Sequence, residues 1–154
     1  MIETPQIVQT EARRTASIHL VVPREQIQQV MGPGIRELMD TLAAQGVKPT
    51  GPWFNRHRRV PSDTFDFEIS VPVDRPVTAA GRVVPGELRA ARVARTVHHG
   101  GYEGLGAAWG ELEAWIRTNG LATGDDLWEC YSVGPESSPD PAAWRTELNR
   151  PLAG

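Results

Sequence analysis

Residues 102–120 read YEGLGAAWGELEAWIRTNG and residues 127–133 read LWECYSV, and these neighbouring segments have different periodicities. From Leu105 to Ile116 the apolar residues recur at i, i+3, i+4 and i+7, which is typical of one face of an amphipathic helix. The pair Asn119-Gly120 ends the helical pattern. Residues 127–133 form a short segment rich in aromatic and apolar types, which is typical of a buried strand. The segment therefore predicts a helix followed by a strand.

The rest of the chain predicts further strands and one more helix. Runs of β-branched residues or period-two alternation indicate strands, and Gly46 is a candidate for the glycine after a helix C-terminus. The triplet Gly32-Pro33-Gly34 is expected to interrupt that first helix. The predicted strands are Gln6–Val22, Trp53–Val60, Thr64–Val73, Glu87–His99, Leu127–Val133 and Arg145–Leu152, and the predicted helices run from Pro23 to Gly46 and from Tyr102 to Asn119.

The predicted elements repeat in the same order, which indicates an internal repeat of approximately residues 5–75 and 84–152 within one domain, residues 1–154. Each repeat would consist of antiparallel strands backed by one helix. Two such repeats predict an α+β fold with a curved antiparallel sheet, two main helices and a central ligand cleft on the pseudo-twofold axis. The alignment behind the repeat places Gly46 on Gly120, Trp53 on Trp128, Phe54 on Glu129 and Arg56 on Tyr131.

The composition favours a globular protein and disfavours a nucleic-acid-binding one. Of the 154 residues, 40% are hydrophobic, which is enough for one core. The 16 Lys and Arg residues against 19 Asp and Glu residues give a net charge of −3, which offers no positive field to a phosphate backbone. The arginine-rich segment 56–59 is expected to be a solvated hairpin. The sequence thus predicts no direct nucleic-acid binding.

Signals for export and for membrane insertion are missing from the sequence. The N-terminus has no basic region followed by an apolar one, and no stretch approaches about 18 consecutive apolar residues. Cys130 is the single cysteine, so no intrachain disulfide is possible. We therefore expect a cytoplasmic protein that does not associate with membranes.

The common motifs for metals, phosphates and serine hydrolases are missing as well. The four histidines lack a Cys-x-x-Cys or His-Glu-x-x-His context. The glycines between residues 100 and 106 are not followed by Gly-Lys-Ser/Thr, and no Gly-x-Ser-x-Gly occurs. The sequence predicts neither a metal nor a cofactor.

Several motifs together resemble those of one known family. They are His99–Leu105, Trp115, Asn119-Gly120, Trp128–Tyr131 and Pro139–Leu148. The chain is similar to the GyrI-like small-molecule-binding domain, which also occurs as the effector-binding domain of AraC-type and MerR-type regulators, and here it would be a stand-alone form. The resemblance covers the whole chain in element order, with most of the specific motifs in the second half. The sequence departs from the family pattern at Gly101, where proline is commoner, and at Asn149-Arg150, where apolar or aromatic residues are usual.

The resemblance implies a pocket between two repeats, in which a buried glutamate and a ring of aromatic residues hold lipophilic cations. Glu129 matches that glutamate, and strand alternation places Tyr131 on the same face. An organic cation would compensate a carboxylate among aromatic rings and would also meet their negative faces. The alternatives are that Glu129 is solvated and that aromatic residues are core, which we expect for Trp115 and Trp128. The candidate ligand-binding residues are Glu129, Tyr131, Trp109, Phe54, Trp53, Phe67, Tyr102 and Trp144.

Two classes of function follow from the resemblance. The first is a stand-alone multidrug-binding protein, without a catalytic step, for amphipathic, aromatic and mostly cationic small molecules such as dyes and drugs. The alternative is a GyrI-like hydrolase that opens the cyclopropane rings of DNA-alkylating natural products with Glu129 and Tyr131 as its catalytic residues. A protein partner, as in gyrase-inhibitory relatives, would need a surface that the sequence does not reveal.

Overall fold

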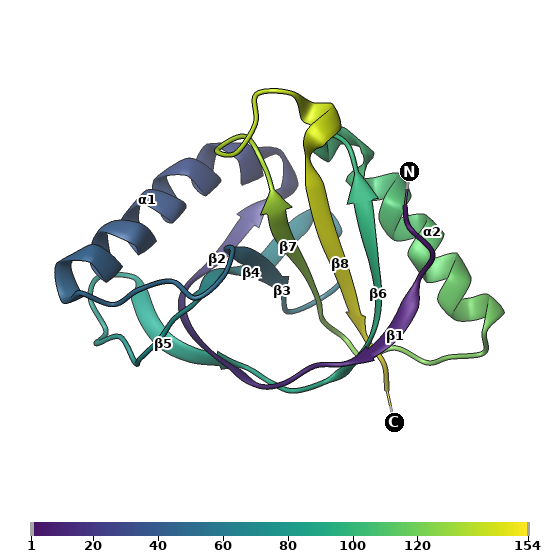
Figure 1. The fold of residues 1–154 in the computed structure, drawn as a ribbon, viewed down its shortest axis with the longest axis horizontal. Helices are drawn as coiled ribbons and strands as arrows, with labels where there is room; N and C mark the ends of the chain where they lie inside the picture. Colours follow the sequence, from purple (N-terminus) through teal and green to yellow (C-terminus); the bar gives the residue numbers. More distant parts are fainter. Residues whose placement is uncertain (1, 154) are drawn as a thin grey trace. The chain divides into compact units, whose positions relative to one another are not determined.

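The computed structural model describes residues 2–153 and divides into two compact units (Figure 1). The 11–90 unit comprises Glu11–Ala90, and the 91–153 unit comprises the described residues on either side of it, residues 2–10 included. Short 3₁₀ turns occur at Arg24–Gln26, Tyr102–Gly104 and Pro141–Ala143. The 11–90 unit contains β2 (Arg13–Pro23), α1 (Ile27–Gln45), β3 (Phe54–His57), β4 (Thr64–Pro72) and β5 (Val83–Leu88). The 91–153 unit contains β1 (Gln6–Gln9), β6 (Arg92–His99), α2 (Leu105–Thr118), β7 (Leu127–Val133) and β8 (Arg145–Pro151).

In each unit, four antiparallel strands pack against one helix, so the chain has the predicted α+β fold. The strand order is β3-β4-β2-β5 in the 11–90 unit and β1-β6-β8-β7 in the 91–153 unit. Along the chain, β2-α1-β3-β4 and β6-α2-β7-β8 have the same order of elements. The predicted hairpin of β3 and β4 is confirmed, although β3 is shorter than the predicted Trp53–Val60.

The core of the 11–90 unit lies between β4 and α1. Because side chains alternate along a strand, Phe67, Ile69 and Val71 of β4 point to one face, as the sequence predicts, and all three are fully buried. They pack with Leu38 and Leu42, which lie on the inward face of α1.

The core of the 91–153 unit lies between α2 and the strands β6 and β8. Its members on α2 are Ala108, Leu112 and Ile116, which follow the predicted helical spacing. They pack with Ala94 of β6 and Leu148 of β8, both fully buried.

The helices end at the predicted glycines. Gly46 follows α1 with a φ of 67°, and Gly120 comes two residues after α2 with a φ of 68°, a left-handed conformation that glycine adopts without steric cost. Across residues 2–153, no helix combines the length and the hydrophobicity needed to cross a membrane.

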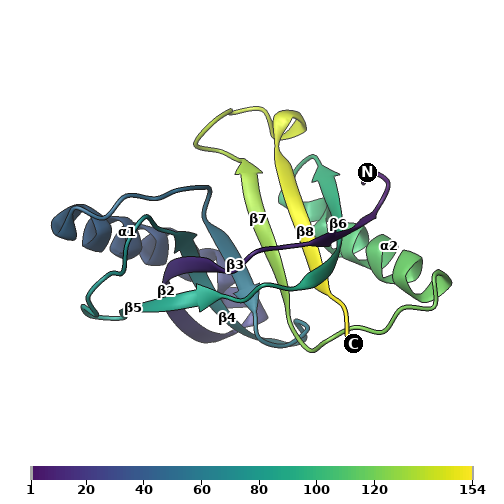
Figure 2. The same cartoon turned by 60° about the horizontal axis from the view of Figure 1, so that its bottom comes forward.

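Two strands that were predicted as continuous are broken. The predicted strand Gln6–Val22 is β1 and β2, and the predicted strand Glu87–His99 covers the end of β5 and all of β6. β1 pairs with β6, whereas β2 pairs with β4 and β5. The labels of β2, β4 and β5 lie together in Figure 2. At the breaks, the Thr10 N–H donates to the Ala91 carbonyl over 2.8 Å, and the Ala91 N–H donates to Thr10 Oγ1 over 3.0 Å. Residues that favour strands continue through each break. The breaks are therefore visible only in the structure, where the pairing partner of the strand changes.

The sequence also misses most of β5, because that segment contains Pro85-Gly86 and resembles a loop. β5 pairs with β2 alone and forms one edge of its four-stranded sheet. Proline lacks a backbone N–H, and an edge strand tolerates it because one side of the strand needs no ladder bond. The edge position explains why a strand forms there against local propensity.

The predicted interruption at Gly32-Pro33-Gly34 is wrong, because α1 continues through Pro33. Proline in a helix leaves the carbonyl four residues earlier, here that of Gln29, without its usual donor. Gln29 is exposed, so water can satisfy this carbonyl. Gly34 brings the helix close to the sheet, since a Cβ placed there would lie 2.5 Å from Cδ1 of the fully buried Ile69.

The two glycines of this triplet should respond oppositely to alanine. Nothing lies within 4 Å of a Cβ at Gly32, so Gly32→Ala should stabilise the protein by about 0.5–1 kcal/mol through helix propensity. Gly34→Ala meets Ile69, and overpacking costs about 1–3 kcal/mol. We expect Gly34→Ala to be at least about 1 kcal/mol less stable than Gly32→Ala in urea unfolding. Equal stability of the two variants would contradict the close approach of α1 to β4.

Candidate functional site

Strand β7 directs Glu129 and Tyr131 to the side of the sheet that α2 covers. Glu129 lies opposite Leu148 in the β7–β8 register, and Leu148 belongs to the core under α2. Trp128 and Cys130 alternate with these residues and point to the other face, where both are buried. The common face of Glu129 and Tyr131 is the one that the alternation predicts.

The Glu129 carboxylate is held by two neutral donors. The indole Nε1–H of Trp109 donates to Oε1 over 2.7 Å, and the hydroxyl of Tyr131 donates to Oε2 over 2.7 Å. Trp109 lies on α2, so the helix and the strand each supply one donor. Both oxygens are thereby fixed in place, and neither donor carries a charge that would neutralise the carboxylate.

The buried arginine on the same side of the sheet is engaged elsewhere. Arg150 of β8 is 5% exposed, and its Nε donates to Glu113 Oε1 of α2 over 2.7 Å. The remaining guanidinium donors bind the carbonyls of Gly124 and Asp126, both over 2.8 Å, and the hydroxyl of Thr123. This departure from the family pattern therefore forms a structural ion pair instead of compensating Glu129.

Two more aromatic residues continue from Tyr131. The Tyr102 ring meets the Tyr131 ring edge-on at a centroid distance of 5.7 Å. On its other side Tyr102 packs against Trp144, with centroids 4.9 Å apart. The Trp144 indole N–H donates to the Ser138 carbonyl over 2.9 Å, which fixes the ring in the turn between β7 and β8. Trp109 and Tyr131 thus contact Glu129 directly, and Tyr102 and Trp144 extend the row of rings from Tyr131.

The Tyr102 hydroxyl is buried, and among the described residues it has no hydrogen-bond partner. Burial raises the pKa of Tyr102 to about 12, and the negative charges of Glu136 and Glu129 add to this effect. The hydroxyl would lie only 2.9 Å from a Cβ at Gly134, so the glycine provides its space. Glu136 and Gly134 were not singled out from the sequence, because only the course of the turn brings them to Tyr102.

The other three sequence candidates lie in the 11–90 unit. Phe67 is fully buried in that unit's core, Phe54 is 1% exposed, and Trp53 is half-buried against the same core. Their contribution to a site with Glu129 stays a prediction.

The predicted repeat alignment is one residue out of register at Glu129. Asn55 of β3 lies opposite Ile69, on the α1 side of its sheet, and its Nδ2 donates to Met31 Sδ over 3.6 Å. Phe54 lies opposite Ser70 and points to the other side. Asn55 is therefore the residue that faces its helix as Glu129 does. Both residues lie nine positions after the glycine that follows their helix, so the extra residue that the alignment of Trp53 with Trp128 assumes is not there.

Residues 3–153 match the family model of the GyrI-like small molecule binding domain, so the chain belongs to this family. The crystal structure of the EcmrR C-terminal domain is similar, with a TM-score of 0.87 and 21% identity over 97% of each chain. The EcmrR chain in a complex with DNA is also similar, with a TM-score of 0.86 and 21% identity. This match covers 97% of the present chain but 57% of EcmrR. A comparison with curated protein sequences found no match.

Two more distant structures are a ligand complex and a hydrolase. SAV2435 bound to tetraphenylphosphonium has a TM-score of 0.66 and 12% identity, with coverage of 99% of this chain and 95% of SAV2435. A hydrolase from Listeria innocua has a TM-score of 0.67 and 13% identity, with coverage of 97% of this chain and 91% of the hydrolase. At these identities the likeness shows a shared fold.

The raised pKa of Tyr102 should be visible in a spectroscopic titration. Tyr102 and Tyr131 are the two tyrosines of the chain, so Tyr131→Phe leaves Tyr102 as the single phenol. We expect its absorbance at 295 nm to change with a midpoint near pH 12, against about 10 for a free phenol. Glu136→Gln should lower the midpoint, because it removes one of the neighbouring charges. A midpoint of about 10 in the folded variant would contradict the burial of Tyr102.

The same shift has a consequence for stability. Because the folded-state pKa lies above the unfolded one, Tyr102 contributes full stability below about pH 10. This contribution is lost as the pH rises from about 10 toward 12, where the unfolded chain releases the phenolic proton first.

Proposed function

We propose that this chain binds lipophilic organic cations at the Glu129 site. The observation that carries the proposal is that Glu129 is positioned by Trp109 and Tyr131, two neutral donors, so its carboxylate remains available to a cationic ligand. Tyr131, Tyr102 and Trp144 would supply flat apolar surfaces beside it. The natural ligand would be recognised by its size, flatness and positive charge.

Two interactions favour a cation over a neutral ligand of the same shape. Each carboxylate oxygen keeps further lone-pair capacity after one hydrogen bond, so a ligand can approach it directly. The rings present negative faces, and a cation within about 6 Å of such a ring gains roughly 0.5–2 kcal/mol. Half-burial of Glu129 weakens solvent screening of the attraction, which is therefore larger than that of an exposed ion pair.

The family membership and one structural neighbour support this class of ligand. The family is a small-molecule-binding one, and SAV2435 shares the fold and was solved with tetraphenylphosphonium, a lipophilic cation. We infer from this fold that cations of similar size are suitable first probes.

The test is calorimetric titration with tetraphenylphosphonium. We expect saturable binding to the wild-type protein, and a loss of about tenfold or more in affinity for Glu129→Gln, which keeps the size of the side chain but removes its charge. Glu111→Gln is the matched control, because Glu111 is an exposed carboxylate of α2 and its substitution changes the net charge equally. Its affinity should stay within about twofold of wild type.

Two results would contradict the proposal. Equal losses in Glu129→Gln and Glu111→Gln would mean that only the overall charge of the protein matters. Unchanged binding by a folded Glu129→Gln variant would mean that the carboxylate is not the counter-charge.

One observation favours a second function, hydrolysis. A buried phenol without a partner costs free energy unless a ligand or a water molecule accepts a hydrogen bond from it. Tyr102 is such a phenol, and the Glu129 charge acts on it. In a cyclopropane-opening reaction, Glu129 would remove a proton from water as the water oxygen bonds to a ring carbon. The broken carbon–carbon bond would release its electron pair into a conjugated carbonyl of the substrate. A tyrosine would donate a hydrogen bond to the resulting oxyanion, which would then gain the proton that Glu129 took from water.

The hydrogen bonds indicate which tyrosine would position the base and which would interact with the substrate oxygen. The Tyr131 hydroxyl already donates to Glu129, so Tyr131 would position the base. Tyr102 has a buried hydroxyl without a partner among the described residues, so it is the group that could donate a hydrogen bond to the developing substrate oxyanion.

Mass spectrometry separates the two functions. If the chain is this hydrolase, incubation with a cyclopropane-bearing DNA-alkylating compound should yield a product heavier by one water, and Tyr102→Phe should slow its formation. An unchanged compound after prolonged incubation with protein that still binds tetraphenylphosphonium would leave binding as the function.

A further inference from the structure

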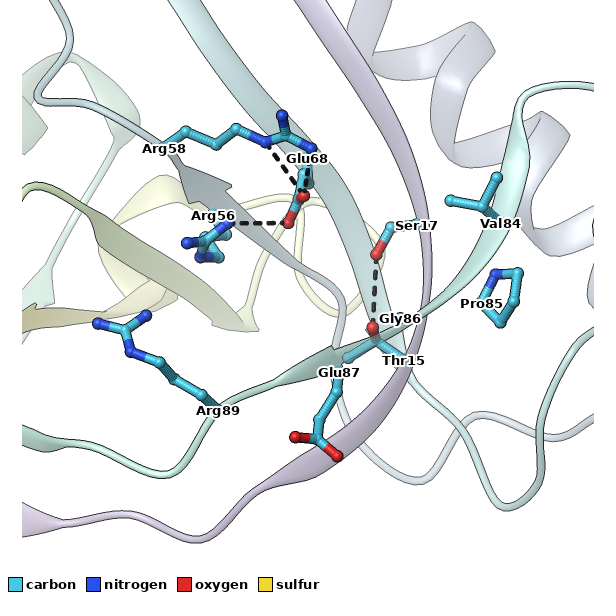
Figure 3. A pocket seen from close by; sticks show the side chains of 10 residues that line it. All are labelled: Thr15, Ser17, Arg56, Arg58, Glu68, Val84, Pro85, Gly86, Glu87 and Arg89. Atoms are coloured by element: carbon cyan, nitrogen blue, oxygen red, sulfur yellow. Dashed lines mark hydrogen bonds and ion pairs between the residues drawn. The ribbon is translucent and has the colours of Figure 1, made fainter.

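The 11–90 unit has a hollow on the face of its sheet opposite α1 (Figure 3). Ala16 and Ile18 of β2 point toward the α1 core, so the alternating residues Thr15 and Ser17 point away from it and line the hollow. Its volume is about 310 Å³, at the small end of the range for ligand pockets. Its remaining lining residues are Arg56, Arg58, Glu68, Val84, Pro85, Gly86, Glu87 and Arg89.

Positive charge dominates the lining of the hollow. Glu68 accepts from Arg58 Nη2 over 3.0 Å and from Arg56 Nη1 over 3.4 Å, so one carboxylate holds two guanidinium groups side by side. Arg89 contributes a third guanidinium, while the Glu87 side chain extends away from all three (Figure 3). The charged residues that line the hollow are thus three arginines and two glutamates, and Glu68 is shared by Arg56 and Arg58.

The floor of the hollow supplies hydroxyl donors. Thr15 Oγ1 lies 3.5 Å from Ser17 Oγ, which lies 2.8 Å from Ser70 Oγ. Thr15 is the end of this chain that lines the hollow, so its proton is available to a ligand when Ser70 donates to Ser17 and Ser17 donates to Thr15. Thr15 and Ser17 are buried, so their hydroxyl groups are fixed by the sheet.

Gly86 leaves this floor open. A Cβ at position 86 would lie 3.0 Å from Thr15 Oγ1 and 3.8 Å from Ser17 Oγ. The φ of Gly86 is not among the positive ones, so the backbone does not require glycine there. The absent side chain keeps the hydroxyl groups accessible from the hollow, beside Val84 and Pro85.

We propose that this hollow binds a small organic anion, a phosphate monoester or a carboxylate with a compact apolar body. Guanidinium groups pair with such anions through two parallel hydrogen bonds, and the hydroxyl chain adds a further donor. Val84 and Pro85 offer the apolar body a surface. The site is separate from the Glu129 site in both residues and charge.

The test is an NMR titration of the full chain with phenyl phosphate, benzoate and inorganic phosphate. We expect saturable shifts at Thr15, Ser17 and Gly86, and tighter binding of phenyl phosphate than of inorganic phosphate, because only the former has an apolar body. Arg58→Gln should weaken phenyl phosphate binding by about tenfold. Arg89→Gln is the second variant, to be used if Arg58→Gln does not fold, and we expect it to weaken phenyl phosphate binding as well.

Arg59→Gln is the matched control. Arg59 neighbours Arg58 in sequence, is 81% exposed, pairs with Asp66 at 3.6 Å and does not line the hollow. It should change phenyl phosphate affinity by less than about twofold. Tetraphenylphosphonium binding should be the same in Arg58→Gln and wild type, which separates this proposal from the proposed function.

Three results would overturn the anion site. The first is the absence of saturable shifts with all three anions. The second is an equal loss in Arg58→Gln and Arg59→Gln, which would indicate non-specific attraction. The third is binding of a short oligothymidylate without binding of phenyl phosphate, which would make the surface one for polyanions.

Discussion

The carboxylate of Glu129 is fixed by an indole N–H and a phenolic hydroxyl, and neither of these neutral donors compensates its charge. A guanidinium in either place would compensate the charge within the protein. The nearby cation, Arg150, is instead held by Glu113 and by backbone carbonyls. In the 91–153 unit, Arg150 is thus paired with Glu113, and the two donors that hold the Glu129 carboxylate are neutral, which is the basis of the proposed binding of organic cations.

Rigid elements hold the two donors in place. Trp109 follows Ala108 on α2, and Tyr131 follows Cys130 on β7, so each donor adjoins a buried residue. The core of α2 with Leu148 of β8 fixes the distance between helix and strand. A site on packed elements loses little freedom when a ligand binds, which favours affinity from a small number of contacts.

The periodicities of the sequence predicted the parts of the site that lie on regular elements, while tertiary effects determined the rest. The alternation in β7 placed Glu129 and Tyr131 on one face, and the helical spacing placed Trp109 inward. The unpartnered Tyr102 hydroxyl depends on the turn that carries Gly134 and Glu136, and no local pattern encodes that course. The breaks between β1 and β2 and between β5 and β6 depend on strand pairing, which residue composition does not specify.

The proposed selection for positive charge at Glu129 is tested most directly with two ions of the same shape. The Trp109 indole N–H resonance, assigned with Trp109→Phe, would report binding of tetraphenylphosphonium and of tetraphenylborate at this site. We expect the cation to shift this resonance with at least about tenfold higher affinity than the anion. Equal affinity, or tighter binding of the anion, would contradict it.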